Sequence, residues 1–127
     1  MTTKTPRRLI VGISGASGTI YGVRMLEMLK KTDIETHLVM SKSAEMTLVY
    51  ETSFKPKDIK ALASVVHPAA DIGASISSGS FPTMGMVIVP CSIRTMSEIA
   101  TGVTSSLVSR AADVVLKEKR RLVLALR

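Results

Sequence analysis

Four glycines with hydroxyl-bearing residues between them follow the first apolar run of the chain. The stretch reads VGISGASGTIYG from Val11 to Gly22, with glycines at 12, 15, 18 and 22. In a turn from a buried strand into a helix, backbone N–H groups point at a ligand and the helix dipole favours negative charge. The glycines let the backbone approach closely, and Ser17 can donate a hydrogen bond. The turn predicts an anion site, most simply a phosphate site; a tight glycine turn without a ligand is the alternative.

The spacing excludes the commonest nucleotide motifs. It is G-x-x-G-x-x-G rather than the G-x-G-x-x-G of dinucleotide folds, and no Gly-Lys-Ser/Thr of a P-loop follows. The next predicted strand ends in Ser41 and Lys42, where an NAD-binding fold would place an acidic residue for the ribose diol. A hydroxyl and an ammonium suit a phosphate monoester better than a neutral diol. These residues therefore favour FMN as the cofactor.

Alternating strands and helices must position this turn. Apolar runs predict buried strands at 8–13, 34–40, 85–90 (ended by Pro90) and 121–126. Helical spacing predicts helices at 20–31, 41–50 and 104–119, with 52–63 weakly helical and 64–85 rich in loops. The alternation indicates βαβ units and a doubly wound parallel sheet covered on both faces, an α/β fold.

Length and composition fit one domain, residues 1–127, with ordinary globular proportions of 46% hydrophobic and 21% charged residues. The net charge of +7 could indicate nucleic acid, but only four aromatic residues and no Trp are present, so an anionic small molecule is the better explanation. No apolar run is long enough to span a bilayer, and the basic MTTKTPRR start is not a secretory signal. A single cysteine favours the cytoplasm.

Several residues with chemical potential have plain structural interpretations. Cys91 after Pro90 is predicted to be a small buried thiol. His37 and His67 lack the spacing of metal ligands, so no metal site is expected. By position alone, Glu51 is a solvated carboxylate at a helix end.

Read in order, the segments GISGASG, VMSKSA, YET, SSGSF, GMVIVPCSIRT and RAADVVLKEKRRLVL resemble the flavin prenyltransferases, the UbiX family. This family was once described as phenolic acid or 3-polyprenyl-4-hydroxybenzoate decarboxylases. The resemblance covers essentially the whole chain. It implies a three-layer αβα flavodoxin-like (Rossmann-like) fold, a homo-oligomer of dodecameric type and no metal.

The resemblance also implies an activity. The family joins the dimethylallyl group of dimethylallyl phosphate to reduced FMN at N5 and C6. The product, prenylated FMN, is the cofactor of a UbiD-type decarboxylase in ubiquinone biosynthesis or aromatic acid decarboxylation.

Site residues follow from the resemblance position by position. Ser17, near the flavin N5, and Glu51, an acid/base beside the substrate phosphate, are the expected catalytic residues. The expected FMN-binding residues are Gly15, Ala16, Ser17, Ser41, Ser92, Ile93, Arg94, Thr95 and Arg127. Arg110 and Lys117 are expected at the dimethylallyl phosphate site, Lys117 from a neighbouring subunit. The SISSGSF segment is expected to be a flap over the flavin. Without the resemblance, Arg110 and Lys117 would be read as a solvated helix face.

The chain departs from the family pattern near its end. It stops at Arg127 without the following glutamate, a later tyrosine and arginine, and the final helix, so we expect a C-terminally truncated domain whose last strand is poorly covered. Ser105 stands where Asp or Asn is usual, and Arg121 where Pro is common. One alternative is therefore an FMN-binding flavoprotein without turnover. Another is a cysteine-decarboxylase-type relative, but PCSIRT replaces the Pro-Ala-Ser-Ala-Asn-Thr motif of those proteins.

Overall fold

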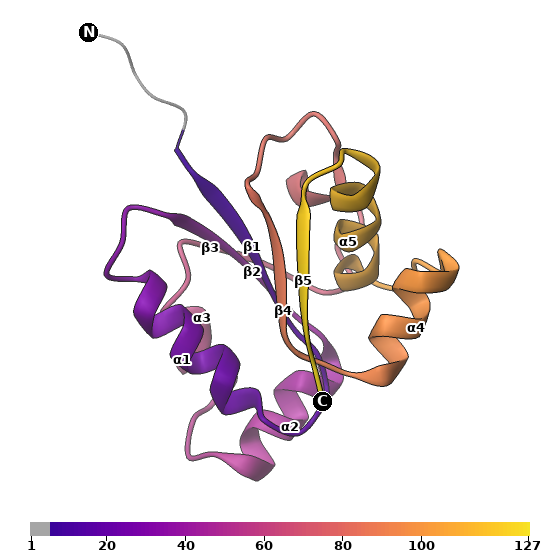
Figure 1. The fold of residues 1–127 in the computed structure, drawn as a ribbon. Coiled ribbons are helices and arrows are strands. Elements are labelled where there is room, and N and C mark those ends of the chain that lie inside the picture. Colours follow the sequence, from indigo (N-terminus) through magenta and orange to yellow (C-terminus); the bar gives the residue numbers. More distant parts are fainter. Residues whose placement is uncertain (1–5) are drawn as a thin grey trace, which may run out of the picture.

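Strands and helices alternate along the chain, as the apolar pattern predicts (Figure 1). The structure, a computed structural model, describes residues 6–127. Its elements are β1 (Arg8–Ile13), α1 (Thr19–Leu29), β2 (Glu35–Met40), α2 (Lys42–Glu51), α3 (Pro56–Lys60), β3 (Val65–His67), a 3₁₀ turn (Ser75–Ser77), β4 (Gly85–Cys91), α4 (Ile93–Thr101), α5 (Leu107–Lys117) and β5 (Arg121–Leu126). The first residues of the basic MTTKTPRR segment lie outside the described part.

The strands form one parallel sheet in the order β3-β2-β1-β4-β5. This is the order of the first five strands in dinucleotide-binding folds. The chain moves outward from β1 to β3 on one side and from β4 to β5 on the other. Between β1 and β4 the direction reverses, and open α/β sheets bind ligands at the carboxyl ends of the strands at such a point. The predicted α/β class is confirmed.

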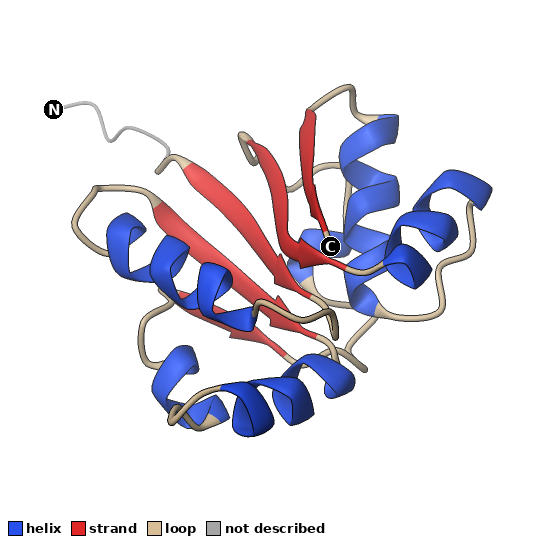
Figure 2. Cartoon of the chain, turned by 60° about the horizontal axis from the view of Figure 1, so that its bottom comes forward, coloured by secondary structure: helices blue, strands red, loops and turns tan. Residues whose placement is uncertain are grey.

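Helices cover both faces of the sheet, which confirms the three layers (Figures 1 and 2). On one face, α1, α2 and α3 pack through Val23, Leu26, Leu48 and Ile59. On the other face, α5 packs through a buried stripe that includes Leu107, Val108, Ala111, Ala112 and Val115. Strand side chains alternate between the two cores, because successive residues of a strand point to opposite faces.

Four details differ from the sequence-based prediction. Residues 65–67 form β3 inside the segment expected to be loop; this strand is short and half-exposed at the sheet edge, so its apolar signal is weak. Helix α4 was not predicted; it is short and none of its side chains is completely buried, although Met96 and Ile99 pack against the core. The prediction that 121–126 is buried is wrong: Val123 and Leu126 are about half exposed, since β5 is the other edge strand. In addition, β4 continues through Pro90 to Cys91.

Within residues 6–127, no helix is both long enough and apolar enough to cross a membrane.

Candidate functional site

A cavity of about 430 Å³ lies between the first turns of α2 and α4, at the carboxyl ends of the strands. Its lining residues are Gly15, Ser41, Lys42, Ser43, Ser92, Arg94, Thr95, Glu98, Ser105 and Ser106. Five residues expected at an FMN site are therefore brought together here from three segments. This is the place where the strand order reverses, so the fold and the residue chemistry indicate the same ligand site.

Two serine-capped helices point their N-termini toward this cavity. Ser41 caps α2 by accepting the N–H of Ala44, and Ser92 caps α4 by accepting the N–H of Thr95. Each cap satisfies the N–H of the third helical residue and leaves those of the first two residues without an intrahelical acceptor. Such N–H groups and the positive end of the helix dipole attract a phosphate.

Ser14, which the sequence analysis did not single out, links the carboxyl ends of strands β1 and β4. It is 1% exposed, its Oγ donates to the Pro90 carbonyl at 2.9 Å, and it accepts the Ser92 N–H at 2.8 Å. The Ser41 N–H in turn donates to the Ile13 carbonyl at 3.0 Å. These bonds fix both caps relative to β1. The only sequence signal for this role of Ser14 is its position at the end of a buried strand.

Two glycines of the first turn are required by its geometry. A Cβ on Gly15 would lie 2.5 Å from the Ser43 Oγ, so the turn touches the start of α2 only because no side chain is present. Gly18, which precedes α1, has φ +100°, a left-handed conformation that favours glycine. The glycine turn therefore forms a wall of the cavity and faces Glu51 on its other side.

Ser17 and Glu51, the two expected catalytic residues, are hydrogen-bonded to each other. The Ser17 Oγ donates to Glu51 Oε2 at 2.7 Å, and the Gly18 N–H donates to Oε1 at 2.9 Å. The Ser17 hydrogen bond, followed by that of Gly18, lowers the pKa of Glu51 below its usual value of 4.5. A carboxylate with both oxygens engaged is held in one orientation and stays ionised at neutral pH.

Arg127 lies near this pair, and its charge contributes to the lowered pKa of Glu51. Its backbone N–H donates to the Cys91 carbonyl, which fixes it beside β4. Arg127 also lines a smaller cavity of about 190 Å³ with Tyr21, Pro90 and other residues. The arginine expected at the flavin is thus close to Glu51.

The charges of the main cavity suit a phosphate ester. Lys42 contributes an ammonium at the start of α2. The one carboxylate of the lining, Glu98, is offset by Arg94 at 3.3 Å and accepts hydrogen bonds from the Ser105 hydroxyl. Cations, hydroxyls and two helix N-termini outweigh this single acid. The donor set therefore fits the phosphate and ribityl hydroxyls of FMN.

Other expected residues do not line this cavity. Arg110 is exposed on α5, and Lys117 at the end of that helix pairs with Asp113 at 3.1 Å. Arg120 donates to the carbonyls of Gly79 and Phe81, so the SSGSF loop packs beside the end of α5. This loop leads into the start of β4, and the last turn of α5 leads into the start of β5, so both lie at the amino end of the sheet (Figure 1). Within this chain the loop does not line the flavin cavity, so its role as a flap over a flavin stays a prediction.

Three further residues singled out from the sequence lie outside the lining of the main cavity. Ala16 is half-buried in the glycine turn, and Ile93 is exposed at the first position of α4; neither lines the cavity. Cys91 is fully buried, and burial raises the pKa of its thiol, which confirms the structural interpretation. Within the described residues, no three His, Cys, Asp or Glu side chains gather as metal ligands.

Comparisons with known proteins identify the family of the chain. A family model described as Flavoprotein matches residues 1–127. Flavin prenyltransferase UbiX of Escherichia coli strain K12 is 64% identical over 122 residues, covering 95% of this chain and 65% of the relative. The chain belongs to the flavoprotein family, and within it to the UbiX group.

Solved structures resemble it equally well. The crystal structure of AnUbiX in complex with FMN and dimethylallyl pyrophosphate has a TM-score of 0.95 and 49% identity, over 97% of this chain and 65% of that one. A dodecameric FMN-dependent UbiX-like decarboxylase from Escherichia coli O157:H7 has a TM-score of 0.93 and 51% identity, over 94% and 66%. The chain spans 65% of the length of the curated UbiX relative from strain K12.

Proposed function

We propose that this protein is a flavin prenyltransferase, which binds FMN between α2 and α4 and joins the dimethylallyl group of dimethylallyl phosphate to the reduced flavin. The contact of Ser17 with Glu51, beside a cavity built for a phosphate ester, carries the proposal. The names of the relatives and the ligands of the AnUbiX crystal support it.

The chain's own residues divide the work between binding and proton transfer. Ser41, Ser92 and the first-turn N–H groups of α2 and α4 bind the phosphate, and Lys42 and Arg94 balance its charge. Reduced FMN, when bound, supplies the electron-rich ring that the dimethylallyl group joins.

Glu51 is the group placed to accept a proton when the new bond forms. Its lowered pKa keeps it ionised and ready at neutral pH, and Ser17 and the Gly18 N–H orient it. Arg127 lies near enough to stabilise an anionic leaving group beside Glu51.

The finer parts of the proposal concern partners. Because Lys117 lies at the far end of α5, we place it, with Arg110, at the dimethylallyl phosphate site of a neighbouring subunit in a homo-oligomer of dodecameric type. The product is passed to a UbiD-type decarboxylase, and the reaction takes place in the cytoplasm. The dodecameric relative and the single buried cysteine support these statements.

Turnover tests the function directly. The protein is incubated with FMN, dimethylallyl phosphate and a reductant, and the flavin is analysed by mass spectrometry. The expected product is heavier than FMN by one prenyl unit, and Glu51→Gln lowers its rate roughly 10²-fold or more while FMN still binds. If the unmodified protein binds FMN but the recovered flavin carries no prenyl unit, the protein is a flavoprotein without this activity.

A further inference from the structure

A carboxylate stands in the main cavity among groups that attract anions. Among the described residues that line this cavity, Glu98 is the single acid, and only 16% of its side chain is exposed. A carboxylate beside a bound phosphate weakens binding, because like charges repel, unless hydrogen-bond donors of the ligand reach it. The presence of Glu98 therefore indicates that one part of the ligand donates hydrogen bonds.

The protein neighbours of Glu98 leave part of its hydrogen-bonding capacity unused. Arg94 Nε lies 3.3 Å from Oε2, but 85% of the Arg94 side chain is exposed, so this ion pair is weak. The Ser105 Oγ lies 2.9 Å from both carboxylate oxygens, yet a hydroxyl has a single hydrogen to donate. Since a carboxylate accepts about four hydrogen bonds, Glu98 can accept further donors from a ligand.

Glu98 lies next to the place where the phosphate is expected. Ser92 caps α4, and Glu98 belongs to the second turn of that helix. One helical turn rises about 5.4 Å, so Glu98 is farther from the cap than the first-turn N–H groups that attract a phosphate. Ser105 and Ser106 line the cavity with Glu98 and extend its polar wall. This wall suits a chain of hydroxyl-bearing carbons attached to the phosphate.

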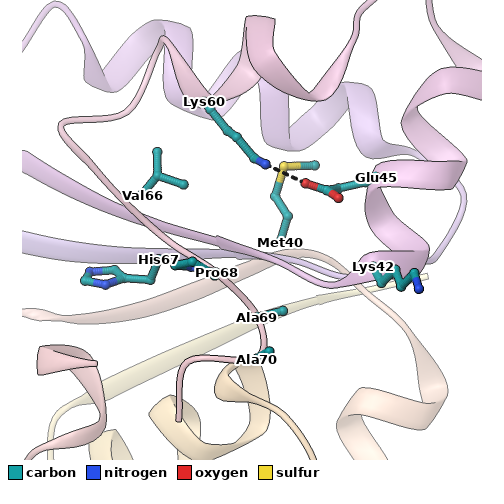
Figure 3. Close-up of a pocket in the computed structure, with 9 residues that line it drawn as sticks. All are labelled: Met40, Lys42, Glu45, Lys60, Val66, His67, Pro68, Ala69 and Ala70. Carbon is teal, nitrogen blue, oxygen red and sulfur yellow. Dashed lines mark ion pairs between the residues drawn. The ribbon is translucent and has the colours of Figure 1, made fainter. Parts of the chain in front are cut away.

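Glu45, in the first turn of α2, has a different environment. It pairs with Lys60 at 2.8 Å and lines a second cavity of about 250 Å³ (Figure 3). Figure 3 shows its carboxylate turned toward the Lys60 ammonium. Glu45 is thus neutralised within the protein and does not line the main cavity. Glu98 is the acid available to the ligand of that cavity.

We propose that Glu98 binds the ribityl hydroxyls of the flavin and makes the cavity selective for a phosphate carried on a polyol chain. The ribityl hydroxyls donate to the Glu98 carboxylate, which the Ser105 hydroxyl holds in place. Glu98 is not among the FMN-binding residues that the resemblance implies. The inference deepens the proposed function and rests on it, since it requires a flavin between α2 and α4.

Affinities of flavin-free protein for FMN, riboflavin and lumiflavin test this proposal; lumiflavin carries a methyl group in place of the ribityl chain. Glu98→Gln is expected to weaken riboflavin binding roughly tenfold, because a neutral acceptor replaces a charged one, and to leave lumiflavin binding unchanged. FMN binding falls less, since the substitution also removes a charge that repels the phosphate. Glu45→Gln is the matched control, and it is expected to leave riboflavin and lumiflavin binding unchanged.

Return of a carboxylate at a neighbouring position identifies the group responsible. Ser105→Asp added to Glu98→Gln is expected to restore riboflavin binding, because the Ser105 Oγ is 2.9 Å from both Glu98 oxygens. Unchanged riboflavin binding and tighter FMN binding in Glu98→Gln would overturn the proposal, since Glu98 would then act only as a nearby charge. Equal losses of riboflavin and lumiflavin would also overturn it, because they would place Glu98 at the flavin ring.

These binding measurements are independent of turnover. FMN binding without prenyl transfer would contradict the proposed function and would leave the role of Glu98 to be decided by the riboflavin result. Prenyl transfer by a protein whose riboflavin affinity does not depend on Glu98 would contradict this inference alone.

Discussion

At the scale of residues, Ser17 and Glu51 become a functional unit only through the fold. The glycine turn exposes the Ser17 hydroxyl and the Gly18 N–H on the side where α2 ends, and Glu51 is the last residue of that helix. Position in sequence predicts a solvated carboxylate, and Glu51 is indeed exposed. The hydrogen bonds from Ser17 and Gly18 hold this exposed carboxylate in one orientation.

The pKa of Glu51 tests this pairing. Ser17→Ala is expected to raise that pKa toward 4.5, because it removes the largest cause of the lowering. The pKa of Glu51 is lower in the folded state than in the unfolded state. Glu51 therefore stabilises the fold at pH values above its unfolded pKa, and this stabilisation is lost as the pH falls through its folded pKa. NMR titration of the Glu51 carboxyl measures the shift. Ser53→Ala is the control, and an unchanged pKa in Ser17→Ala would contradict the pairing.

Ser14→Ala is expected to lower the free energy of unfolding by about 1–3 kcal/mol, because it leaves the part-buried Ser92 N–H without its acceptor. It should also weaken FMN binding, since the cap of α4 loses its link to β1. Urea unfolding and flavin titration measure the two effects. The exposed Ser97→Ala serves as control, and full stability of Ser14→Ala would show that the link is dispensable.

At the scale of elements, the contact between the glycine turn and α2 shapes the flavin cavity. Gly15→Ala is expected to destabilise the protein by about 1–3 kcal/mol, because the new Cβ would overlap Ser43. Gly73→Ala is the control, since its nearest neighbour would be 3.8 Å away. Thermal unfolding compares the two variants. Similar midpoints would mean that the turn can move away from α2 without loss.

Strands β2 and β3 are joined by a pair of histidines. The His37 Nδ1 and His67 Nε2 atoms are 2.9 Å apart, and His37 Nε2 lies 2.7 Å from Glu35 Oε1. Burial is the main cause that lowers the pKa of His67 below 6.5. Because its folded pKa is below the unfolded value, His67 contributes stability above pH 6.5 that is lost as pH falls toward the folded pKa.

We expect His67→Phe to weaken the pH dependence of stability and to lower stability at neutral pH, since His37 loses a buried partner. Unfolding in urea at about pH 7.5 and about pH 5.5 measures both effects. If the variant loses as much stability on acidification as the unmodified protein does, the pH dependence of stability belongs to groups other than His67.

At the scale of the molecule, the sequence pattern predicts most of the fold because buried strands and amphipathic helices have strong periodic signals. It misses β3 and α4, which are short and have no completely buried side chain. It overestimates the burial of β5, because an apolar pattern does not reveal which strand lies at an edge. Ser41, Lys42 and the glycine turn line one cavity, as their pattern predicts, and that cavity is where we propose the flavin phosphate binds. The role of Ser14 depends on tertiary contacts that no local pattern contains.

One exposed apolar face of helix α2 predicts that copies of the chain assemble into an oligomer. Met46, Val49 and Tyr50 lie three and four residues apart on one helix face and are more than half exposed. This face adjoins Glu51. The double variant Val49→Lys, Tyr50→Lys is expected to lower the mass measured by sedimentation velocity, because charge disfavours an apolar interface. Met84→Lys is the control, from an exposed loop residue. An unmodified protein that sediments as a single chain would contradict the proposed assembly.

The comparison of FMN with riboflavin tests the account's central claim, that the capped N-termini of α2 and α4 form a flavin phosphate site. The two ligands differ only in the phosphate, so their affinities for flavin-free protein isolate its contribution. The account predicts that FMN binds roughly 100-fold more tightly, as expected for several charge-assisted hydrogen bonds. Equal affinities for FMN and riboflavin would contradict it.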